Sequence, residues 1–414
     1  MTAIVGGLNK HAVAIAADSA VTMGNTHKVV NSANKIFTLS KYHPVAVMTY
    51  SNADFMGVPW DIIIKEYRKN LDDKCFPVLN DYIEHFVQFL HHRKFFCDEE
   101  TQRSYMLFLL DDFFKSCRNE ILREKGIKEQ ELTEEFISEK LQLYLEKTKE
   151  EKQCPEFKEY NYIDFEIYAK KNIDEYAKNV DFNNVELLCK SFYHYLSAQL
   201  NLPLNTGLVF VGYGEEEIYP SLFPMNISFG MDKHLRYYLE ENRVAKNSNQ
   251  GPFAVIAPFA QVDVTQTIVR GINPSFQDII YNVIGKSIHS FSKTITDILD
   301  ANPSTQMVSS AIKNLDKNDI ISDITHQINI QMYKNYTEPL LNTVMSLDKE
   351  DMANMAESFI SLTSLVRRMQ PGEETVGGPV DVAVISKGDG FVWINRKHYF
   401  KPELNAPFFK NYFK

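Results

Sequence analysis

Strand-forming segments stand at both ends of this 414-residue chain and again in its middle, with helical segments between them. Near the start, TAIVGGL and HAVAIAA are short apolar runs joined by NK, and NKIFTLS and PVAVMTY repeat the pattern across KYH. Such pairs predict two successive β-hairpins. Near the end, two alternating runs in GGPVDVAVISKGDGFVWI are joined by Lys387 to Gly390, which predicts another hairpin. We therefore expect a layered α+β protein.

Helical periodicity occupies the stretches between these strands. It begins after Asn52 and returns from Val78 to Leu90. Glu, Lys and Tyr dominate between Cys97 and Asp181, which predicts exposed helices with little apolar material for a core of their own. The middle strands are expected in TGLVFVGYG, EIYPSLFPMNISFGM, LRYYLE and PFAVIAPFA. We divide the chain into core segments at 1–96, 182–273 and 351–414, and helical insertions at 97–181 and 274–350.

Composition narrows the classes of function. The net charge of −10, with no basic run free of acids, argues against a nucleic-acid partner. The five cysteines form no CxxC pair, which is typical of thiols in a reducing compartment. We find no signal-peptide pattern and no apolar run near the roughly 18 residues of a membrane span. We expect a cytoplasmic protein without a membrane partner, a metal or a cofactor.

Thr2 is the residue with the clearest chemical potential. Removal of Met1 would leave a free α-amine beside the Thr2 hydroxyl, and an α-amine titrates near ~8, so it can accept the hydroxyl proton at neutral pH. Such a nucleophile needs a fixed cation nearby and a carboxylate to hold that cation. Asp18 ends the second expected strand and Lys35 opens the third, so both side chains can reach the start of the first strand if these strands are neighbours.

The stretch TAIVGGLNKHAVAIAADSAVTMGNT, followed by NKIF, resembles the start of mature proteasome β subunits and of the bacterial protease HslV. Thr2, Asp18 and Lys35 match that family's catalytic threonine, strand-end aspartate and lysine, with one inserted residue before Lys35. The resemblance implies an N-terminal-nucleophile (Ntn) hydrolase, a four-layer αββα sandwich enlarged here by helical insertions.

The same resemblance implies a substrate site. The backbone N–H of Tyr50 would stabilise the oxyanion where the family has a glycine. Val21, Thr22, Phe37 and Met48 would surround the substrate side chain before the scissile bond, with Thr22 pairing an extended substrate through its backbone and Phe37 and Met48 forming the pocket floor. Because none of these side chains is charged, we expect apolar residues to be preferred there.

Other positions depart from the family. Val376 stands where a supporting serine is expected, Glu373 lies near the usual aspartate, and Ala257 to Gln261 replace a Ser/Gly-rich turn. The implied function is hydrolysis of peptides or unfolded proteins inside a homo-oligomeric ring, with an ATP-dependent unfoldase as a partner that the resemblance allows. An amidase for small molecules, and an inactive binding or assembly protein on the same fold, remain as alternatives.

Two further patterns favour ordinary structural roles. Glu84, His91 and His92 share one expected helix, but a polar helix face with histidines is commoner than a zinc site. Gly212 to Gly214 could suggest a phosphate loop, yet three glutamates follow and would repel phosphate.

Overall fold

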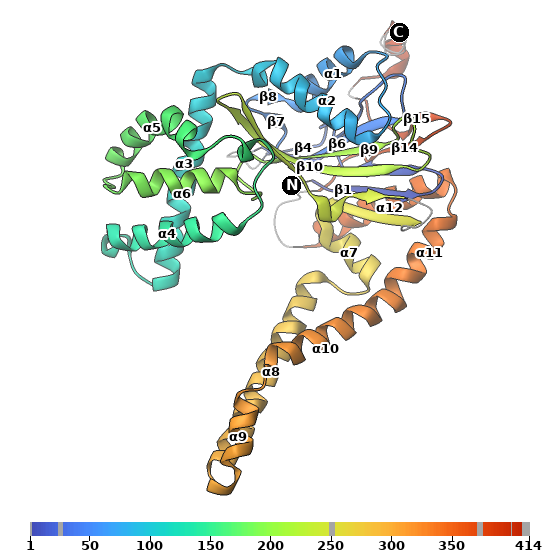
Figure 1. The fold of residues 1–414 in the computed structure, drawn as a ribbon. Helices are drawn as coiled ribbons and strands as arrows, with labels where there is room; N and C mark the ends of the chain where they lie inside the picture. The colour runs from blue at the N-terminus through green and yellow to red at the C-terminus, as the bar shows by residue number, and fades with distance from the viewer. Residues whose placement is uncertain (1, 24–27, 248–252, 371–375, 399, 408–414) are drawn as a thin grey trace. The chain divides into compact units, whose positions relative to one another are not determined.

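The computed structural model describes residues 2–23, 28–247, 253–370, 376–398 and 400–407. The protein is α+β, as expected from the sequence, and its internal contacts divide it into two compact units (Figure 1). The first unit contains Met1–Ala33, Asn247–Val384 and Trp393–Lys414, and the second contains Asn34–Lys246 and Ile385–Val392. This division follows the two main sheets except at the last hairpin, where Ile385–Val392 belong to the second unit. The five segments expected from the sequence stay a prediction. None of the described helices is long and apolar enough to cross a membrane.

The first unit is built on a five-stranded sheet in the order β13-β1-β2-β14-β15. Its strands are β1 (Ile4–Asn9), β2 (Val13–Ala17), β13 (Ala254–Ala260), β14 (Asp381–Ser386) and β15 (Gly390–Asn395). The first and last hairpins therefore form where the alternating runs predicted them. In the last hairpin, between β14 and β15, Gly390 adopts a φ of 74°, which the tight turn requires.

Small residues allow helix α12 (Lys349–Met369) to pack closely on this sheet. Alternation places Ala14 and Ala16 of β2 on one face, where they join a buried cluster with Ala353 and Ala356 of α12. A Cβ atom at Gly7 would lie only 2.7 Å from a methionine methyl group of the same helix. The alanine-rich sequence of the second strand is thus explained by the helix that covers it.

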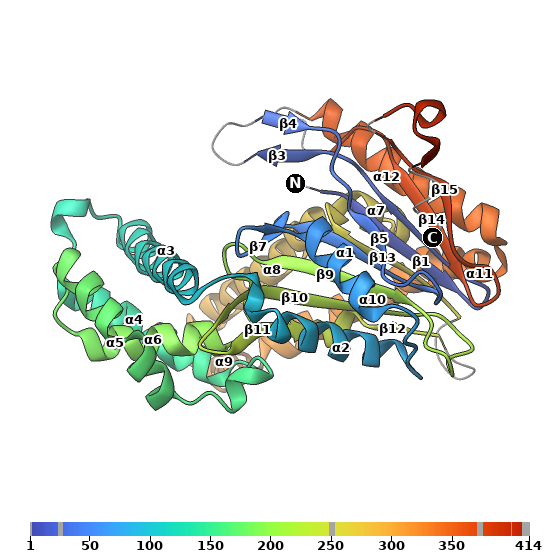
Figure 2. The same cartoon turned by 90° about the horizontal axis from the view of Figure 1, so that it is seen from above.

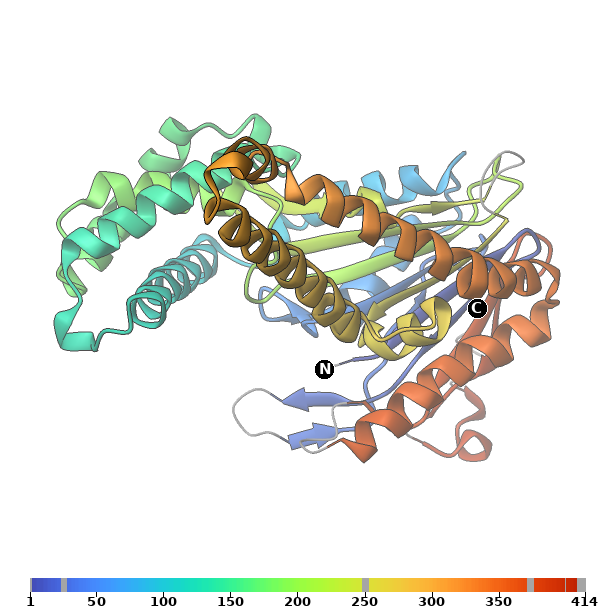
Figure 3. The same cartoon turned by 90° about the horizontal axis from the view of Figure 1, so that it is seen from below.

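The remaining helices of the first unit lie between β13 and α12 in the sequence. They are α7 (Val262–Arg270), α8 (Pro274–Asp300), α9 (Gln306–Lys313), α10 (Lys317–Met332), the π-helical turn η7 (Tyr333–Thr337) and α11 (Glu338–Ser346). Helices α8 and α10 run side by side and form an arm that leads away from this unit's sheet (Figures 1 and 3). Pro274, in the first turn of α8, has a φ that suits a helix start.

The second unit contains a sheet in the order β11-β10-β9-β6-β5, with β12 paired to β10. The strands are β5 (Ile36–Thr38), β6 (Val45–Ser51), β9 (Thr206–Gly212), β10 (Ser221–Met231), β11 (His234–Leu239) and β12 (Ala245–Lys246). Helices α1 (Trp60–Leu71) and α2 (Leu79–His92) belong to the same buried cluster as the sheet. The helix expected directly after Asn52 starts later, because the small hairpin of β7 (Asp54–Phe55) and β8 (Val58–Pro59) precedes it.

Four helices of the second unit form a module, seen from above in Figure 2. They are α3 (Glu99–Lys125), α4 (Glu134–Glu150), α5 (Tyr162–Asn179) and α6 (Val185–Ser197). Their charged residues are largely exposed, while Phe113, Leu141, Phe165 and Phe192 belong to the same buried cluster as α1 and α2. The module therefore shares the core of its unit and has more apolar material than its charged sequence indicated.

Arg236 of β11 connects this module to the sheet. Its guanidinium donates to the carbonyl oxygens of Leu196, Ala198 and Leu200 at 2.6, 2.5 and 2.9 Å, and to the Ser228 hydroxyl at 2.9 Å. These carbonyls lie at the end of α6 and just beyond it, where backbone acceptors lack partners within the helix and a cation is favourable. The fully buried arginine therefore caps α6 from the neighbouring strand.

We expect Arg236→Ala to lower the free energy of unfolding by about 3 kcal/mol or more, because it leaves three carbonyl groups without their charged donor. Urea denaturation followed by circular dichroism measures this change. Arg123→Ala, at an exposed position of α3, is the matched control and should change stability by less than about 0.5 kcal/mol. Equal effects of the two substitutions would contradict the capping role of Arg236.

Candidate functional site

Asp18 holds the start of β1 in the first unit. Its Oδ1 accepts a hydrogen bond of 2.8 Å from the backbone N–H of Ala3, and its own N–H donates to the Ala3 carbonyl oxygen at 3.1 Å. Thr2 is 6% exposed and Asp18 is 1% exposed. The structure thus brings the predicted nucleophile and the predicted carboxylate to the same end of the hairpin.

The second oxygen of Asp18 binds two more backbone groups. Oδ2 accepts from the N–H of Ala20 at 3.1 Å and from the N–H of Gly377 at 3.2 Å. A buried carboxylate with several N–H donors is well stabilised, since hydrogen bonds to a charged acceptor are stronger than neutral ones. We use the name Asp18 clasp for Asp18 with Ala3, Ala20 and Gly377. It joins the start of β1, the end of β2 and the turn before β14.

Ser19 extends the clasp to the rest of that turn. Its N–H donates to the Gly377 carbonyl oxygen at 3.1 Å, and its hydroxyl donates to the Pro379 carbonyl oxygen. Gly378 has a φ of 74°, and a Cβ atom there would lie 2.9 Å from the Asn31 side chain. Only glycine therefore fits this turn. No pattern in the sequence had indicated a role for Ser19, Gly377 or Gly378.

The expected serine at position 376 is replaced by a buried valine in the first unit's core. The Val376 carbonyl oxygen accepts a hydrogen bond of 3.4 Å from the hydroxyl of Ser364, a residue of α12. A serine thus contacts this turn from another element, and no spacing in the sequence indicated it. Three other features of the sequence analysis, Met1, Gly24 to Thr26 and Glu373, lie outside the described residues.

The segment Ala257 to Gln261 borders the same end of β1. Ala260 pairs with Ile4, and the register shifts between Ile4 and Val5, which marks a bulge or irregularity. Gln261 then adopts a left-handed conformation with a φ of 52° and starts α7. Where the resemblance implies a Ser/Gly-rich turn, this chain therefore has the end of β13 followed directly by α7.

Val21 and Thr22 belong to a separate short sheet of the first unit. Strand β3 (Val21–Met23) pairs with β4 (Lys28–Val30), where Thr22 lies opposite Val29. Among the described strands, β3 pairs only with β4, so its other edge has no strand beside it. Such an edge is compatible with the predicted pairing of Thr22 to an extended substrate, which stays a prediction.

The other predicted site residues belong to the second unit. Lys35 is buried, and its carbonyl oxygen accepts a hydrogen bond of 2.9 Å from the N–H of Thr49. Its position beside Thr2 stays a prediction, because the two residues are in different units.

The phenol of Tyr50 lies against Gly207 of β9, where a Cβ atom would be only 1.9 Å from the ring. Its hydroxyl donates to Glu240 Oε1 at 3.1 Å. Burial, followed by the negative charge of Glu240, raises the pKa of Tyr50. The phenol therefore stays protonated and acts as a hydrogen-bond donor to Glu240 at neutral pH.

The backbone of Tyr50 faces strand β9. Successive N–H groups of a strand point to opposite sides, and the N–H of Thr49 points to the β5 side, where it binds Lys35. The N–H of Tyr50 therefore points toward β9, where Tyr50 is in register with Gly207. An amide within a strand pairing is not positioned to bind an oxyanion unless that pairing opens.

Phe37 and Met48 lie on opposite faces of their sheet. Phe37 is opposite Val47, and its neighbour Ile36 is opposite Met48. Paired residues of antiparallel strands share a face and consecutive residues alternate, so Phe37 and Met48 cannot share one. Phe37 belongs to the cluster with α1 and α2. The single pocket floor expected from these two residues is therefore wrong.

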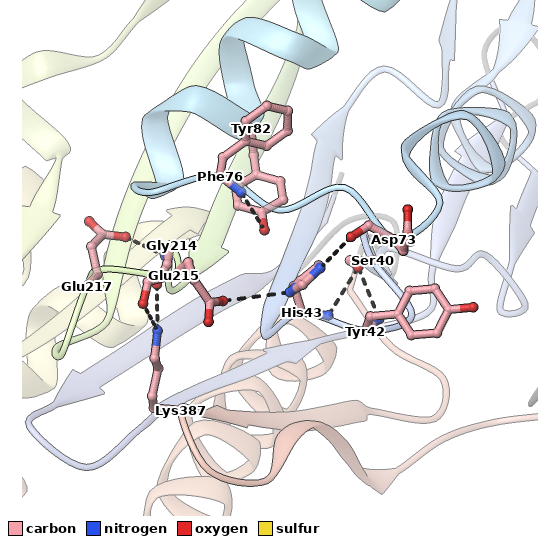
Figure 4. A network of polar contacts seen from close by, with 10 residues as sticks. All are labelled: Ser40, Tyr42, His43, Asp73, Phe76, Tyr82, Gly214, Glu215, Glu217 and Lys387. Atoms are coloured by element: carbon pink, nitrogen blue, oxygen red, sulfur yellow. Dashed lines mark hydrogen bonds and ion pairs between the residues drawn. The ribbon is translucent and has the colours of Figure 1, made fainter.

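The GYG segment does not form a phosphate site. Glu217 Oε2 accepts from the N–H of Gly214 at 2.6 Å and from the N–H of Leu79, the first residue of α2, at 2.9 Å. A helix start is where an anion would bind, and Glu217 already occupies it. Lys387 donates to the carbonyl oxygens of Gly214 and Glu215 at 2.7 Å, which ties this turn to the last hairpin (Figure 4).

Glu84 and His91 of α2 have structural partners. His91 Nε2 lies 2.7 Å from Glu156 Oε1, and Glu84 accepts a hydrogen bond of 2.8 Å from Asn80. In the part of the chain that the structure describes, no group of three or more His, Cys, Asp or Glu side chains could hold a metal ion.

A cavity of about 860 Å³ in the first unit lies apart from the Asp18 clasp. It is lined by β13, α7, α10 and η7, with Arg270, His326, Tyr333 and Lys334 as its charged or titratable residues. Neither Thr2 nor Asp18 lines it, so it does not belong to the candidate site.

We expect Asp18→Asn to lower the free energy of unfolding by about 2 kcal/mol, because an amide has one acceptor oxygen and would leave part of the clasp without a partner. Urea denaturation tests this. Asp348→Asn is the matched control: Asp348 caps α12 by accepting from the N–H of Asp351, and asparagine caps a helix equally well. Similar losses in both variants would contradict the clasp.

Comparisons with known proteins add little to this geometry. No protein-family profile matches the sequence, and no curated protein matches it. Among solved structures, the chain is similar to Anbu from Hyphomicrobium sp. strain MC1, with 8% identity and a TM-score of 0.30 over 100% of this chain and 97% of that one. It is also similar to Anbu (ancestral beta-subunit) from Yersinia bercovieri, with 8% identity and a TM-score of 0.29 over 99% and 94% of the two chains.

These matches correct the assignment made from the sequence. The structures named above are Anbu proteins, so the assignment to proteasome β subunits or HslV, which the N-terminal stretch resembles, is wrong. It depended mainly on the first part of the chain, where Thr2, Asp18 and Lys35 match that family's spacing. At TM-scores near 0.3 the likeness to Anbu carries no conclusion about fold or activity.

Proposed function

We propose that this chain is an N-terminal-threonine hydrolase that cleaves amide bonds in peptides. The observation that supports it is the Asp18 clasp, which holds the backbone next to Thr2 at a buried, negatively charged position. A nucleophile at a chain end is useful only if the end is fixed, because catalysis needs reacting atoms held in a narrow range of positions.

In the proposed reaction the Thr2 hydroxyl oxygen attacks the carbonyl carbon of the substrate, and the free α-amine of Thr2 accepts the hydroxyl proton. The amine then transfers this proton to the leaving nitrogen as the amide bond breaks. The resulting ester on Thr2 is hydrolysed by water, which the amine activates in the same way, and the hydroxyl is restored.

Asp18 and Lys35 have electrostatic roles in this proposal. A positive Lys35 beside Thr2 would favour the neutral form of the amine and the developing alkoxide, and Asp18 would balance the lysine's charge.

The Tyr50 oxyanion donor and the pocket floor of Phe37 and Met48 are not part of this proposal. The N–H of Tyr50 points toward β9, and its use would require the pairing with Gly207 to open.

A four-layer αββα arrangement belongs to the proposal, because each unit has one main sheet with helices packed on it. Confinement of the site in a homo-oligomer belongs to it as well.

The test of this proposal combines intact mass with covalent labelling. Mature protein should begin at Thr2, and a peptide epoxyketone should add once per chain, because the ring that it forms needs both a hydroxyl and a free α-amine on one residue. Thr2→Ala should abolish labelling and turnover of a fluorogenic peptide. Thr2→Ser should keep part of both, because it retains the two reacting groups.

Substitution of the lysine is the second test. Lys35→Ala should reduce kcat/KM by about 100-fold or more, the usual effect of losing one electrostatic group of an active site. The control, Lys41→Ala, changes an exposed lysine in the turn before β6 and should leave activity unchanged. Equal activity of both variants would remove Lys35 from the mechanism.

Three results would contradict this proposal and favour a different function or a different nucleophile. Stable retention of Met1 would favour the inactive binding or assembly protein, since it blocks the amine. Turnover of small amides without turnover of peptides would favour the amidase. Full activity of Thr2→Ala would mean that the nucleophile is another residue.

A further inference from the structure

Helix α8 carries an exposed apolar stripe. Phe276, Ile279, Val283, Phe291 and Ile298 are 56, 55, 56, 68 and 67% exposed, respectively. At 100° per residue these five side chains fall within an arc of about 120° on one side of the helix. We call this set the α8 stripe. A group of exposed apolar side chains along one side of a helix, here interspersed with Ser287, Ser290 and Thr294, indicates an interaction surface.

The stripe is distinct from the face by which α8 packs within its own chain. On that other face, Gln277 and Tyr281 both donate to Asn329 Oδ1 of α10 at 3.0 Å. A Cβ atom at Gly285 would lie 3.8 Å from Ile321 of α10. Helix α8 therefore packs on α10 with one face, and α9 also contacts it, while the α8 stripe stays exposed.

The arrangement of the stripe is symmetric about Ser287. Phe276 precedes Ser287 by 11 residues and Ile298 follows it by 11, while Val283 precedes it by four and Phe291 follows it by four. Ile279 has Ile295 at the corresponding distance, eight residues to either side, but Ile295 is only partly exposed and lies outside the arc of the stripe. A two-fold axis at Ser287 would thus place Phe276 level with Ile298, and Val283 level with Phe291, of an antiparallel second helix.

We propose that the α8 stripe is a seam at which two copies of this chain associate, with their α8 helices antiparallel and the two-fold axis at Ser287. Phe276 of one copy then packs on Ile298 of the second copy, and Val283 on the second copy's Phe291. The small side chain of Ser287 lets the helices approach closely at the axis. A self-complementary surface is what an isologous dimer requires.

The size of the stripe suits this partner. Taking about 150–250 Å² for an aromatic side chain and less for isoleucine and valine, its exposed apolar surface is roughly 500 Å² per copy. Two copies would bury about 1,000 Å², the lower limit for a specific interface. The paired segment, from Phe276 to Ile298, is about 33 Å long at 1.5 Å per residue. The inference is independent of the proposed hydrolase activity.

Sedimentation velocity on the full chain provides the first test. The double variant Val283→Glu with Phe291→Glu should lower the mass of the assembly at least twofold, because it puts charges into the apolar seam. The control, Asn282→Glu with His289→Glu, makes the same changes at exposed positions of α8 outside the stripe and should keep the wild-type mass. An unchanged mass in the stripe variant would overturn the proposal and point to a different partner.

Disulfide formation tests the orientation. In a Cys75→Ser background, which removes the exposed native thiol, Ser287→Cys should give a covalent dimer on mild oxidation, and His289→Cys should not. Phe276→Cys alone should also stay monomeric under denaturing conditions, because antiparallel helices keep the two positions far apart. Efficient crosslinking through Phe276→Cys would overturn the antiparallel arrangement, and equal crosslinking at positions 287 and 289 would overturn the seam.

Discussion

The Asp18 carboxylate is the group on which the candidate site depends. It is buried, and its two oxygens accept hydrogen bonds from residues at three places in the chain, Ala3, Ala20 and Gly377. A buried carboxylate without partners would be strongly destabilising, so folding selects the arrangement in which all three donors meet. The start of β1 is thereby held even though it lies near a chain end, where strands normally fray.

Close backbone approaches made possible by small residues organise both units. In the first unit, Gly378 lets its turn pack against Asn31, and the alanines of β2 let α12 approach the sheet. In the second unit, Gly207 accommodates the ring of Tyr50. A side chain at either glycine would collide with its neighbour, which makes these positions as restrictive as the large residues that pack on them.

Two buried charged side chains are stabilised by backbone groups of opposite polarity. Asp18 is surrounded by backbone N–H donors, and Arg236 by backbone carbonyl acceptors together with one serine. In both cases the polar backbone at the end of an element supplies the partner, where such groups are not consumed by regular secondary structure. Each buried charge therefore connects separate helices, strands or turns. A salt bridge between two surface side chains would contribute much less to stability.

The sequence by itself determined the α+β class, the first and last hairpins, the amphipathic helix after Pro77 and the position of Asp18 near the start of the first strand, because alternation, turn residues and the length of one hairpin are local properties. Only the tertiary structure decided that Gly377 completes the clasp, that Phe37 and Met48 face opposite sides of their sheet and that the Tyr50 N–H points toward β9. These outcomes depend on strand register and on contacts between residues hundreds of positions apart, and a one-residue shift of register reverses the face of every side chain in a strand.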